Sequence, residues 1–425
     1  MLARLSIRRT RLLQWWVTRD GLSGDAVLYG LSALFALVLG WTSTQVAQWH
    51  WGYLATGPYF VAAVVAYGLA RLKPRRSTVL RIALLALVIM GAVIIPLGLE
   101  TRWRHQDPAM GFAQPEVSVI ERSAAYVSQG KDPYRTYEKN GHLVGVLPGL
   151  PAYESFFPYF PLMSIFGLPS AETHLGSGLT DARIVMTLMT LLTSSAALLL
   201  LKGSRRKKIR VAQVLLALPT GALFLSTGGD DMPILALMLL AIAFLERRSS
   251  NAAGVSLGIA GAMKLTAWPL ALGALLVAKN KEGNSTWVRV AAWVAAIVLV
   301  TVTPFVFKAP WAFFSNVFAF PLGLAGVASP AASALPGHIL TTLWSPFGHI
   351  LAPLTLLVGG YFAVRHAQEH WPLSLSRLLG MLSVAFAVMI CVASATRIGY
   401  VIYPINFALW SWVTVSHEVR EPVLV

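Results

Sequence analysis

Carboxylates that could act as general bases stand in residues 100–169, the one long segment outside the apolar blocks of the chain. Glu116 and Glu121 are five positions apart, and residues 117–127 between and beyond them have the pattern of an amphipathic helix. Five residues turn a helix through about 500°, so the two side chains point about 140° apart and cannot serve one site. We expect Glu116 to face a cavity on the membrane side, where it could take a proton from a hydroxyl group, and Glu121 to face water.

Two further motifs follow in the same segment. Residues 130–134 read Gly-Lys-Asp-Pro-Tyr, in which the glycine suits a left-handed helix cap and the proline prevents continuation of the helix. Asp132 either caps a turn or contacts a substrate together with Tyr134. The aromatic and proline run at 156–162, which includes Tyr159, is typical of the interfacial beginning of a membrane helix. It could equally form an apolar wall for a lipid chain or a sugar.

A second pair of acids, Asp230 and Asp231, follows two glycines at the boundary of an apolar run. Adjacent carboxylates cannot share one face of a helix. One of them is therefore expected to cap the helix that begins here, and the other is left available for chemistry. No histidine or further carboxylate stands at ligand spacing, so we expect no metal site at this turn.

Positive groups stand at the ends of other apolar runs. A guanidinium group such as that of Arg397 matches the paired oxygens of a phosphate ester, and Tyr400 lies three positions later. Lys264 is a candidate phosphate ligand or the partner of an acid, or it extends to the membrane interface. His338 is compatible with a structural role and with a role in the site.

The composition indicates the class of protein that carries these residues. Of the 425 residues 56% are hydrophobic and 12% are charged, whereas soluble domains carry about 25% charged residues. We predict an all-α polytopic membrane protein with one integral membrane domain, 1–425, and extracytoplasmic loops at 100–169 and 307–348. The stretch 310–340 is broken by four prolines and is expected to be a loop with interfacial helices. About twelve apolar runs could cross a bilayer, namely 26–47, 57–72, 80–98, 184–201, 211–227, 232–245, 252–263, 266–278, 287–306, 349–364, 378–394 and 401–415.

Charge orients these spans. With the N-terminus inside, the inner segments carry 24 Lys and Arg against 7 Asp and Glu, and the outer segments carry 10 against 11. This asymmetry follows the positive-inside rule, and it predicts a multi-pass protein of the plasma membrane with both termini cytoplasmic. The large loop and the polar groups named above then share the outer face. The basic runs 71–76 and 202–210 are expected to be retention and lipid-contact charges, so membrane lipids are partners and nucleic acid is not.

Taken in order, these features resemble polyprenyl-phosphate-sugar-dependent membrane glycosyltransferases of the GT-C class, and within it family 87, which includes actinobacterial mannosyltransferases. The family shows an acidic residue, an alanine-rich helix, Gly-x-Asp-Pro-Tyr and Phe-x-Tyr-x-Pro-Leu. A polar glycine turn, a Gly-x5-Lys segment and an Arg-Tyr pair near Tyr-Pro come later. Over residues 110–410 the counterparts are Glu116, Ala124-Ala125, 130–134, 157–162, 228–231, 258–264, Arg397, Tyr400 and Tyr403-Pro404. The family's acid is usually Asp, soon after the first span and four residues before a tyrosine. Glu116 follows three predicted spans here, and Ile120 stands in place of the tyrosine.

The resemblance implies a GT-C-like fold and transfer of mannose, or another hexose or pentose, from a polyprenyl-phosphate donor. The acceptor would be a lipid or a cell-envelope glycan on the outer face, and no cofactor is implied. Glu116 would be the base, with Asp230 or Asp231 as the alternative. The residues implied at the donor phosphate and the substrate are Lys264, Arg397 and His338, and Asp132, Tyr134, Tyr159 and Tyr400.

Two other functions stay open at this point. Many spans and intramembrane charges also fit a transporter or flippase of lipid-linked sugars, although we see no repeated halves of the kind that transporters show. The departures at Glu116 and Ile120 also fit a non-catalytic partner in cell-envelope assembly. A fold that binds a nucleotide is not expected, because the sequence has neither G-x-G-x-x-G nor a P-loop pattern.

Overall fold

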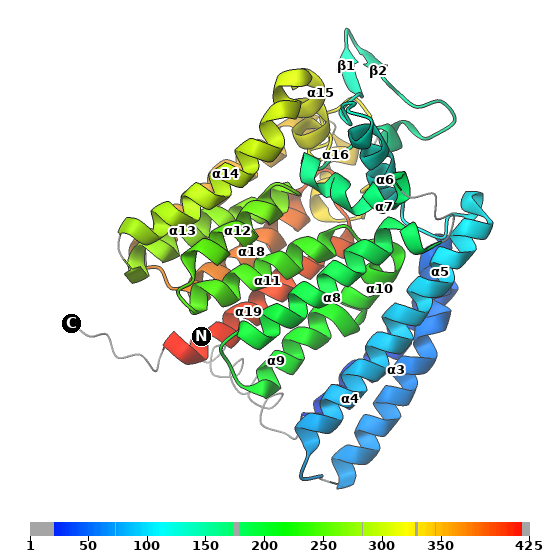
Figure 1. Ribbon diagram of the computed structural model, residues 1–425, viewed down its shortest axis with the longest axis vertical. Coiled ribbons are helices and arrows are strands. Elements are labelled where there is room, and N and C mark those ends of the chain that lie inside the picture. Colours follow the sequence, from blue (N-terminus) through cyan, green and yellow to red (C-terminus); the bar gives the residue numbers. More distant parts are fainter. Residues whose placement is uncertain are drawn as a thin grey trace. The chain divides into compact units, whose positions relative to one another are not determined.

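Helices make up most of the computed structural model, which describes residues 21–72, 74–172, 178–282, 284–327, 330–344 and 346–418 (Figure 1). Its all-α polytopic character confirms the predicted fold class. The basic N-terminal segment used to orient the chain lies outside the described residues. Eight described helices are long and apolar enough to cross a membrane, namely Leu22–Thr42, Val46–Leu72, Ser77–Gln106, Ala182–Leu200, Arg205–Thr227, Ser285–Lys308, Leu375–Val392 and Ile398–Val415.

The remaining four predicted spans are also helical but are not among these eight. Helices α11 (Asp231–Glu246), α12 (Ser250–Gly261) and α13 (Trp268–Glu282) have 16, 12 and 15 residues, and α17 is Pro346–Glu369. Between α12 and α13 lies the 3₁₀ turn η7 (Leu265–Ala267), so the predicted runs 252–263 and 266–278 correspond to two short helices.

The chain folds into two compact units, which we describe separately. The first holds residues 21–114 and 203–232, together with a few residues around 178. The predicted single membrane domain stays a prediction. The elements of the first unit are α2 (Leu22–Thr42), α3 (Val46–Leu72), α4 (Ser77–Ile89), the π-helical turn η1 (Met90–Ile94), α5 (Ile95–Gln106), η2 (Pro108–Met110), α9 (Arg205–Ala212), the π-helical turn η6 (Gln213–Ala217) and α10 (Pro219–Thr227).

Close backbone contact joins α2 to α3. A Cβ atom at Gly52 would lie 2.5 Å from the Gly40 nitrogen and 2.6 Å from the Ala36 carbonyl oxygen, so only glycine allows this approach. Helix α3 begins at Val46, eleven residues before the predicted start at 57, and continues through Pro58. Helices α4 and α5 run as one rod through η1 (Figure 1).

A buried ion cluster corrects part of the charge assignment. Arg81 and Arg210 both pair with Asp25, at 2.6 and 2.5 Å, and Asp25 is completely buried. Gln213 adds a hydrogen bond of 3.0 Å to the same carboxylate. Arg210 was expected to contact lipid within the basic run 202–210. It is instead the partner of a buried acid, because an unpaired carboxylate between helices would be costly.

The second unit holds residues 115–172, 180–202 and 233–418 of the described chain. Helices α18 and α19 pack together, as do α12 and α14, and α13 contacts both α14 and α18 (Figure 1). Besides α11–α13, α17 and η7, its elements are α6 (Pro115–Ser128), β1 (Tyr137–Lys139), β2 (His142–Val144), η3 (Ala152–Ser155), η4 (Pro161–Gly167), α7 (Leu168–Glu172), α8 (Ala182–Leu200), α14 (Asn284–Lys308), α15 (Pro310–Phe314), the π-helical η8 (Ser315–Ala319), α16 (Pro336–Leu343), α18 (Leu375–Val392), η9 (Ile398–Val401) and α19 (Ile402–Glu418). The 3₁₀ turn η5 (Gly178–Thr180) lies where the units meet in sequence.

The large loop contains a feature that the sequence analysis missed. Strands β1 and β2 form an antiparallel hairpin in which Lys139 pairs with His142. Asn140 and Gly141 between them have φ angles of 52° and 79°. Asn-Gly is a strong signal for a two-residue hairpin turn because both positions need positive φ.

The aromatic run at 156–162 does not begin a membrane-spanning helix. Phe156, Phe157 and Phe160 are at most 4% exposed, and the run leads into the 3₁₀ helix η4 and the five-residue α7. The Phe160 and Leu162 amides donate to the carbonyls of Met263 and Ala262, at 3.0 and 3.3 Å. The run is therefore a buried segment packed on the end of α12, and contact with a lipid chain or a sugar stays a prediction.

Candidate functional site

Helix α6 presents Glu116 from its first turn, as predicted. Its buried face packs on η4, where a Cβ atom at Gly167 would lie 2.7 Å from the Glu121 Cα atom. The hydroxyls of Ser123 and Ser164 are hydrogen bonded at 2.8 Å across this contact. The helix ends at Ser128, and Gly130 two positions later has a φ of 69°, the left-handed conformation expected from the sequence.

Helix geometry predicted that Glu121 faces water, and the structure shows that this prediction is wrong. It is half-buried, and its Oε1 accepts a hydrogen bond of 3.1 Å from the Ala182 amide at the start of α8. The exposed N–H groups of a helix start favour a carboxylate, so Glu121 joins α6 to α8. The 140° separation from Glu116 directs Glu121 at a neighbouring helix.

Glu116 and Arg397 form the centre of the candidate site. The Arg397 Nη1 donates to Glu116 Oε1 at 2.6 Å, and the side chains are 33% and 17% exposed, respectively. Glu116 Oε2 is buried and has no hydrogen-bond partner among the residues that the structure describes. Although burial alone would lower the pKa of Arg397, the Glu116 carboxylate and the nearby Tyr400 and Tyr159 hydroxyls raise it above its usual range.

The backbone around Arg397 is fixed by the segment before α16. The Thr396 amide donates to Ala331 O at 2.8 Å, and the Ser333 amide donates to Thr396 O at 2.9 Å. The Ser333 hydroxyl accepts from the Ile398 amide at 3.0 Å. These bonds hold Arg397 in extended conformation immediately before η9.

Lys264 lies close to the same group of side chains. Its Nζ stands 5.4 Å from the centre of the Tyr159 ring, a cation–π contact. The hydrogen bonds from the aromatic run to the end of α12 place Tyr159 beside Lys264. The predicted residues thus form two contacting pairs, Glu116 with Arg397 and Lys264 with Tyr159. Tyr159 and Tyr400 are both near enough to Arg397 to affect its pKa.

Asp132 and Tyr134 have structural contacts. Asp132 Oδ1 accepts from the Tyr134 amide at 2.8 Å, which is the predicted turn cap. Tyr134 is 2% exposed, and its hydroxyl donates to the Tyr159 carbonyl at 2.7 Å. Burial raises the pKa of Asp132, against the attraction of Lys308. Tyr134 therefore supports the backbone at Tyr159, and substrate contact by Tyr134 or Asp132 stays a prediction.

His338 also has a structural contact. Its Nδ1 lies 2.9 Å from the Ser394 carbonyl oxygen, which links α16 to the extended segment that carries Arg397. A Cβ atom at the preceding Gly337 would lie 2.2 Å from the Val392 carbonyl, so α16 and the end of α18 touch through their backbones. His338 holds the segment next to Arg397, and a phosphate contact is not needed to explain its position.

Asp230 and Asp231 belong to the turn between α10 and α11 in the first unit. Gly228 ends α10 in the left-handed region, with φ of 104°. Asp230 is 6% exposed and directly precedes α11, and Asp231 is the first residue of that helix. The predicted arrangement of a glycine turn with two acids at a helix start is present.

The sequence analysis missed a second acid near Glu116. The pKa of Glu154 is raised by burial and, more weakly, by Glu116, while Arg122 opposes the increase. The pKa of the neighbouring Tyr153 is also raised, first by burial and then by the charges of Glu154 and Glu116. The Arg122 Nη2 donates to the Glu154 carbonyl at 2.7 Å and holds η3 against α6. The Tyr-Glu pair just before the aromatic run was the available signal.

The structure defines a helical membrane protein in which helix α6 holds a carboxylate against a guanidinium. Two phenols lie near enough to affect that guanidinium, and an ammonium stands over the ring of one of them. Comparison with protein families gives the class a name. The sequence profile of glycosyltransferase family 87 matches residues 157–395, more than half of the chain, and the protein belongs to this family. No curated protein matches the sequence. The profile match includes Tyr159 and Lys264 but neither Glu116 nor Arg397, so the geometry alone supports the role of that pair.

Proposed function

We propose that this family 87 glycosyltransferase moves a sugar from a polyprenyl-phosphate donor to a hydroxyl group of a lipid or cell-envelope glycan. The sugar would be mannose or another hexose or pentose. The one-sided distribution of Lys and Arg supports a reaction on the outer face of the plasma membrane. A donor that is already attached to a lipid needs no nucleotide-binding fold, and the sequence has no motif for one.

The observation that carries the proposal is the pairing of Glu116 with Arg397. One oxygen of the carboxylate is held by the guanidinium, and the other is buried without a partner in the described part of the chain. Sugar transfer from a lipid phosphate needs a proton acceptor at the hydroxyl and positive charge at the leaving phosphate. The pair provides both groups side by side.

The reaction then has two connected parts. The acceptor oxygen attacks the anomeric carbon and its proton passes to the Glu116 carboxylate, while the bond from that carbon to the phosphate oxygen breaks. The departing polyprenyl phosphate keeps the bonding electrons, and the charges of Arg397 and Lys264 stabilise it. Donor phosphate would compete with Glu116 for the Arg397 fork, which frees the carboxylate for the acceptor hydroxyl. Tyr159 and Tyr400 would line the binding site for the sugar.

Purified full-length protein in lipid nanodiscs tests the proposal. Radiolabelled polyprenyl-phosphate mannose and its pentose counterpart would each be offered with a lipid extract as acceptor, and nucleotide sugars would serve as the comparison. We expect label in the acceptor only from a lipid-linked donor and only with intact Glu116. Transfer from a nucleotide sugar would contradict the proposed donor. Movement of donor across the bilayer without transfer would favour the transporter.

A further inference from the structure

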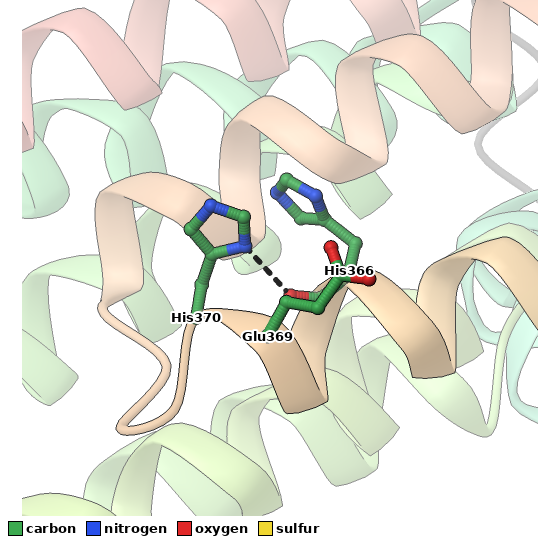
Figure 2. A group of neighbouring side chains, drawn as sticks. All are labelled: His366, Glu369 and His370. Carbon is green, nitrogen blue, oxygen red and sulfur yellow. Dashed lines mark hydrogen bonds between the residues drawn. The ribbon is translucent and has the colours of Figure 1, made fainter.

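Helix α17 ends in a cluster of metal-ligating side chains that the proposed reaction does not use. His366, Glu369 and His370 each offer one ligand atom, and these three atoms lie within 4.8 Å of one another (Figure 2). The cluster arises from helical spacing, because positions i, i+3 and i+4 fall on one face. His366 and Glu369 are exposed and His370 is half-buried, so a dissolved ion can reach them.

We propose that His366, Glu369 and His370 form a binding site for a divalent transition-metal cation of the zinc type. Two imidazoles and one carboxylate are a ligand set that zinc accepts, and a water molecule or another group would complete four-coordination. A tetrahedral site with Zn–N distances of about 2.0–2.1 Å needs ligand atoms about 3.3–3.5 Å apart. The three ligand atoms already lie within 4.8 Å of one another, so small rotations about the side-chain bonds of His366, Glu369 and His370 would bring them to that spacing.

The hydrogen bonding of His370 favours this function. Its Nδ1 lies 2.9 Å from the His366 carbonyl oxygen (Figure 2). A ring that donates from Nδ1 to a carbonyl keeps its lone pair on Nε2, and this is how metal-binding histidines are commonly oriented. The two rings are already close, with centres 4.1 Å apart.

The end of the helix adds a favourable field. The last carbonyls of α17 give its C-terminal turn a partial negative charge, which stabilises a bound cation. Two positive side chains act against it. Arg365 pairs with Glu369 at 3.5 Å, and Arg377 reaches the His370 carbonyl, also at 3.5 Å. Because the Arg365 pair is exposed, it is weak and yields readily to a metal ion.

Zinc binding by the full-length protein, purified without a histidine tag, tests the site. Calorimetric titration with zinc chloride should give one site per chain, and nickel should also bind, whereas magnesium and calcium should not. Loss of an outer contact to a metal ligand costs about 10–100-fold in affinity. We therefore expect His366→Ala with His370→Ala to weaken zinc binding by at least that much.

Three further variants make the result specific. Arg365→Ala removes the competitor for Glu369 and should bind zinc at least as tightly as the parent, while Glu369→Gln should bind more weakly. His142→Ala removes an exposed histidine of the β hairpin and should leave binding unchanged. Equal affinity in the double histidine variant and the parent would overturn the proposal, as would equal binding of magnesium and zinc. Neither result bears on sugar transfer, which is measured separately.

Discussion

Glu116 and Arg397 lie 281 positions apart in the chain and are joined by a hydrogen bond of 2.6 Å. Because one carboxylate oxygen is used in this pair and no described residue hydrogen bonds to the other, the acid has room for one more ligand. The guanidinium has further N–H groups for a phosphate. In the proposed reaction, this arrangement would connect donor binding to release of the base.

The first prediction concerns the base. Glu116→Gln keeps the shape of the side chain and removes its proton affinity, so turnover should fall by about 10²–10⁴-fold. Donor affinity should be unchanged or higher, because Arg397 loses its competing partner. Glu121→Gln and the exposed Glu172→Gln are matched controls that should turn over normally. Normal turnover by Glu116→Gln, with inactive Asp230→Asn or Asp231→Asn, would assign the base to the turn before α11.

The second prediction concerns the donor phosphate. Removal of one partner from a largely buried charge pair costs about 3–5 kcal/mol. Arg397→Ala should therefore raise KM for the donor by about 10²-fold or more, with a smaller effect on the acceptor. Arg397→Lys should rescue only part of the loss, because it keeps the charge but not the fork. Lys264→Ala should act in the same direction, and Lys139→Ala on the exposed hairpin should not. Wild-type donor kinetics in both Arg397→Ala and Lys264→Ala would place the phosphate elsewhere.

The third prediction concerns the backbone contact that supports Arg397. Gly337→Ala would push a Cβ atom into the Val392 carbonyl, so we expect a loss of about 1–3 kcal/mol in stability. The resulting displacement of α16 should also move His338 and the extended segment that carries Arg397, so donor use should fall. Gly359→Ala on α17 meets open space and should be neutral or slightly stabilising. Thermal unfolding in detergent compares the two, and equal unfolding temperatures would refute the contact.

The fourth prediction concerns pH. Burial raises the pKa of Asp132, so its charged form is less favourable in the folded protein than in the unfolded chain. Asp132 therefore lowers stability as pH rises through its ordinary and then its raised pKa, and has no such effect below both. Asp132→Asn keeps the acceptor for the Tyr134 amide. Its unfolding temperature should equal or exceed that of the parent at about pH 7, with a smaller difference near about pH 4. Asp132→Ala, which loses the hydrogen bond, should unfold earlier at both pH values, and a lower unfolding temperature of Asp132→Asn at neutral pH would contradict the argument.

The fifth prediction concerns topology. In a Cys391→Ser background, which removes the single native cysteine, Lys139→Cys should react with an impermeant reagent in intact cells. Arg206→Cys should react only after the membrane is permeabilised, because the predicted topology puts 24 of the 34 Lys and Arg on its side, which the positive-inside rule makes cytoplasmic. The reverse labelling pattern would overturn the orientation and the outer-face site.

The sequence alone determined the features that depend on residues close together in the chain. Hydropathy identified the helical membrane class, because a long apolar run can cross a bilayer as a helix whose backbone hydrogen bonds are all internal. Local rules also predicted the α6 helix, its Gly130 cap and the Asp132 turn. The order of the motifs indicated family 87. The helix, its cap and the turn each depend on a short stretch of sequence, and the family depends on the order of short motifs along the chain.

Tertiary structure decided which distant groups meet. The sequence could show that Glu116 and Glu121 diverge, but only packing decided that Glu121 would cap α8 and that Glu116 would meet Arg397. The aromatic run became a buried segment because the end of α12 offered carbonyls to its amides. Arg210 does not serve as a lipid-contact charge, because its guanidinium pairs with the buried carboxylate of Asp25. Buried polar groups must be satisfied, and their partners are set by how helices far apart in the chain pack together.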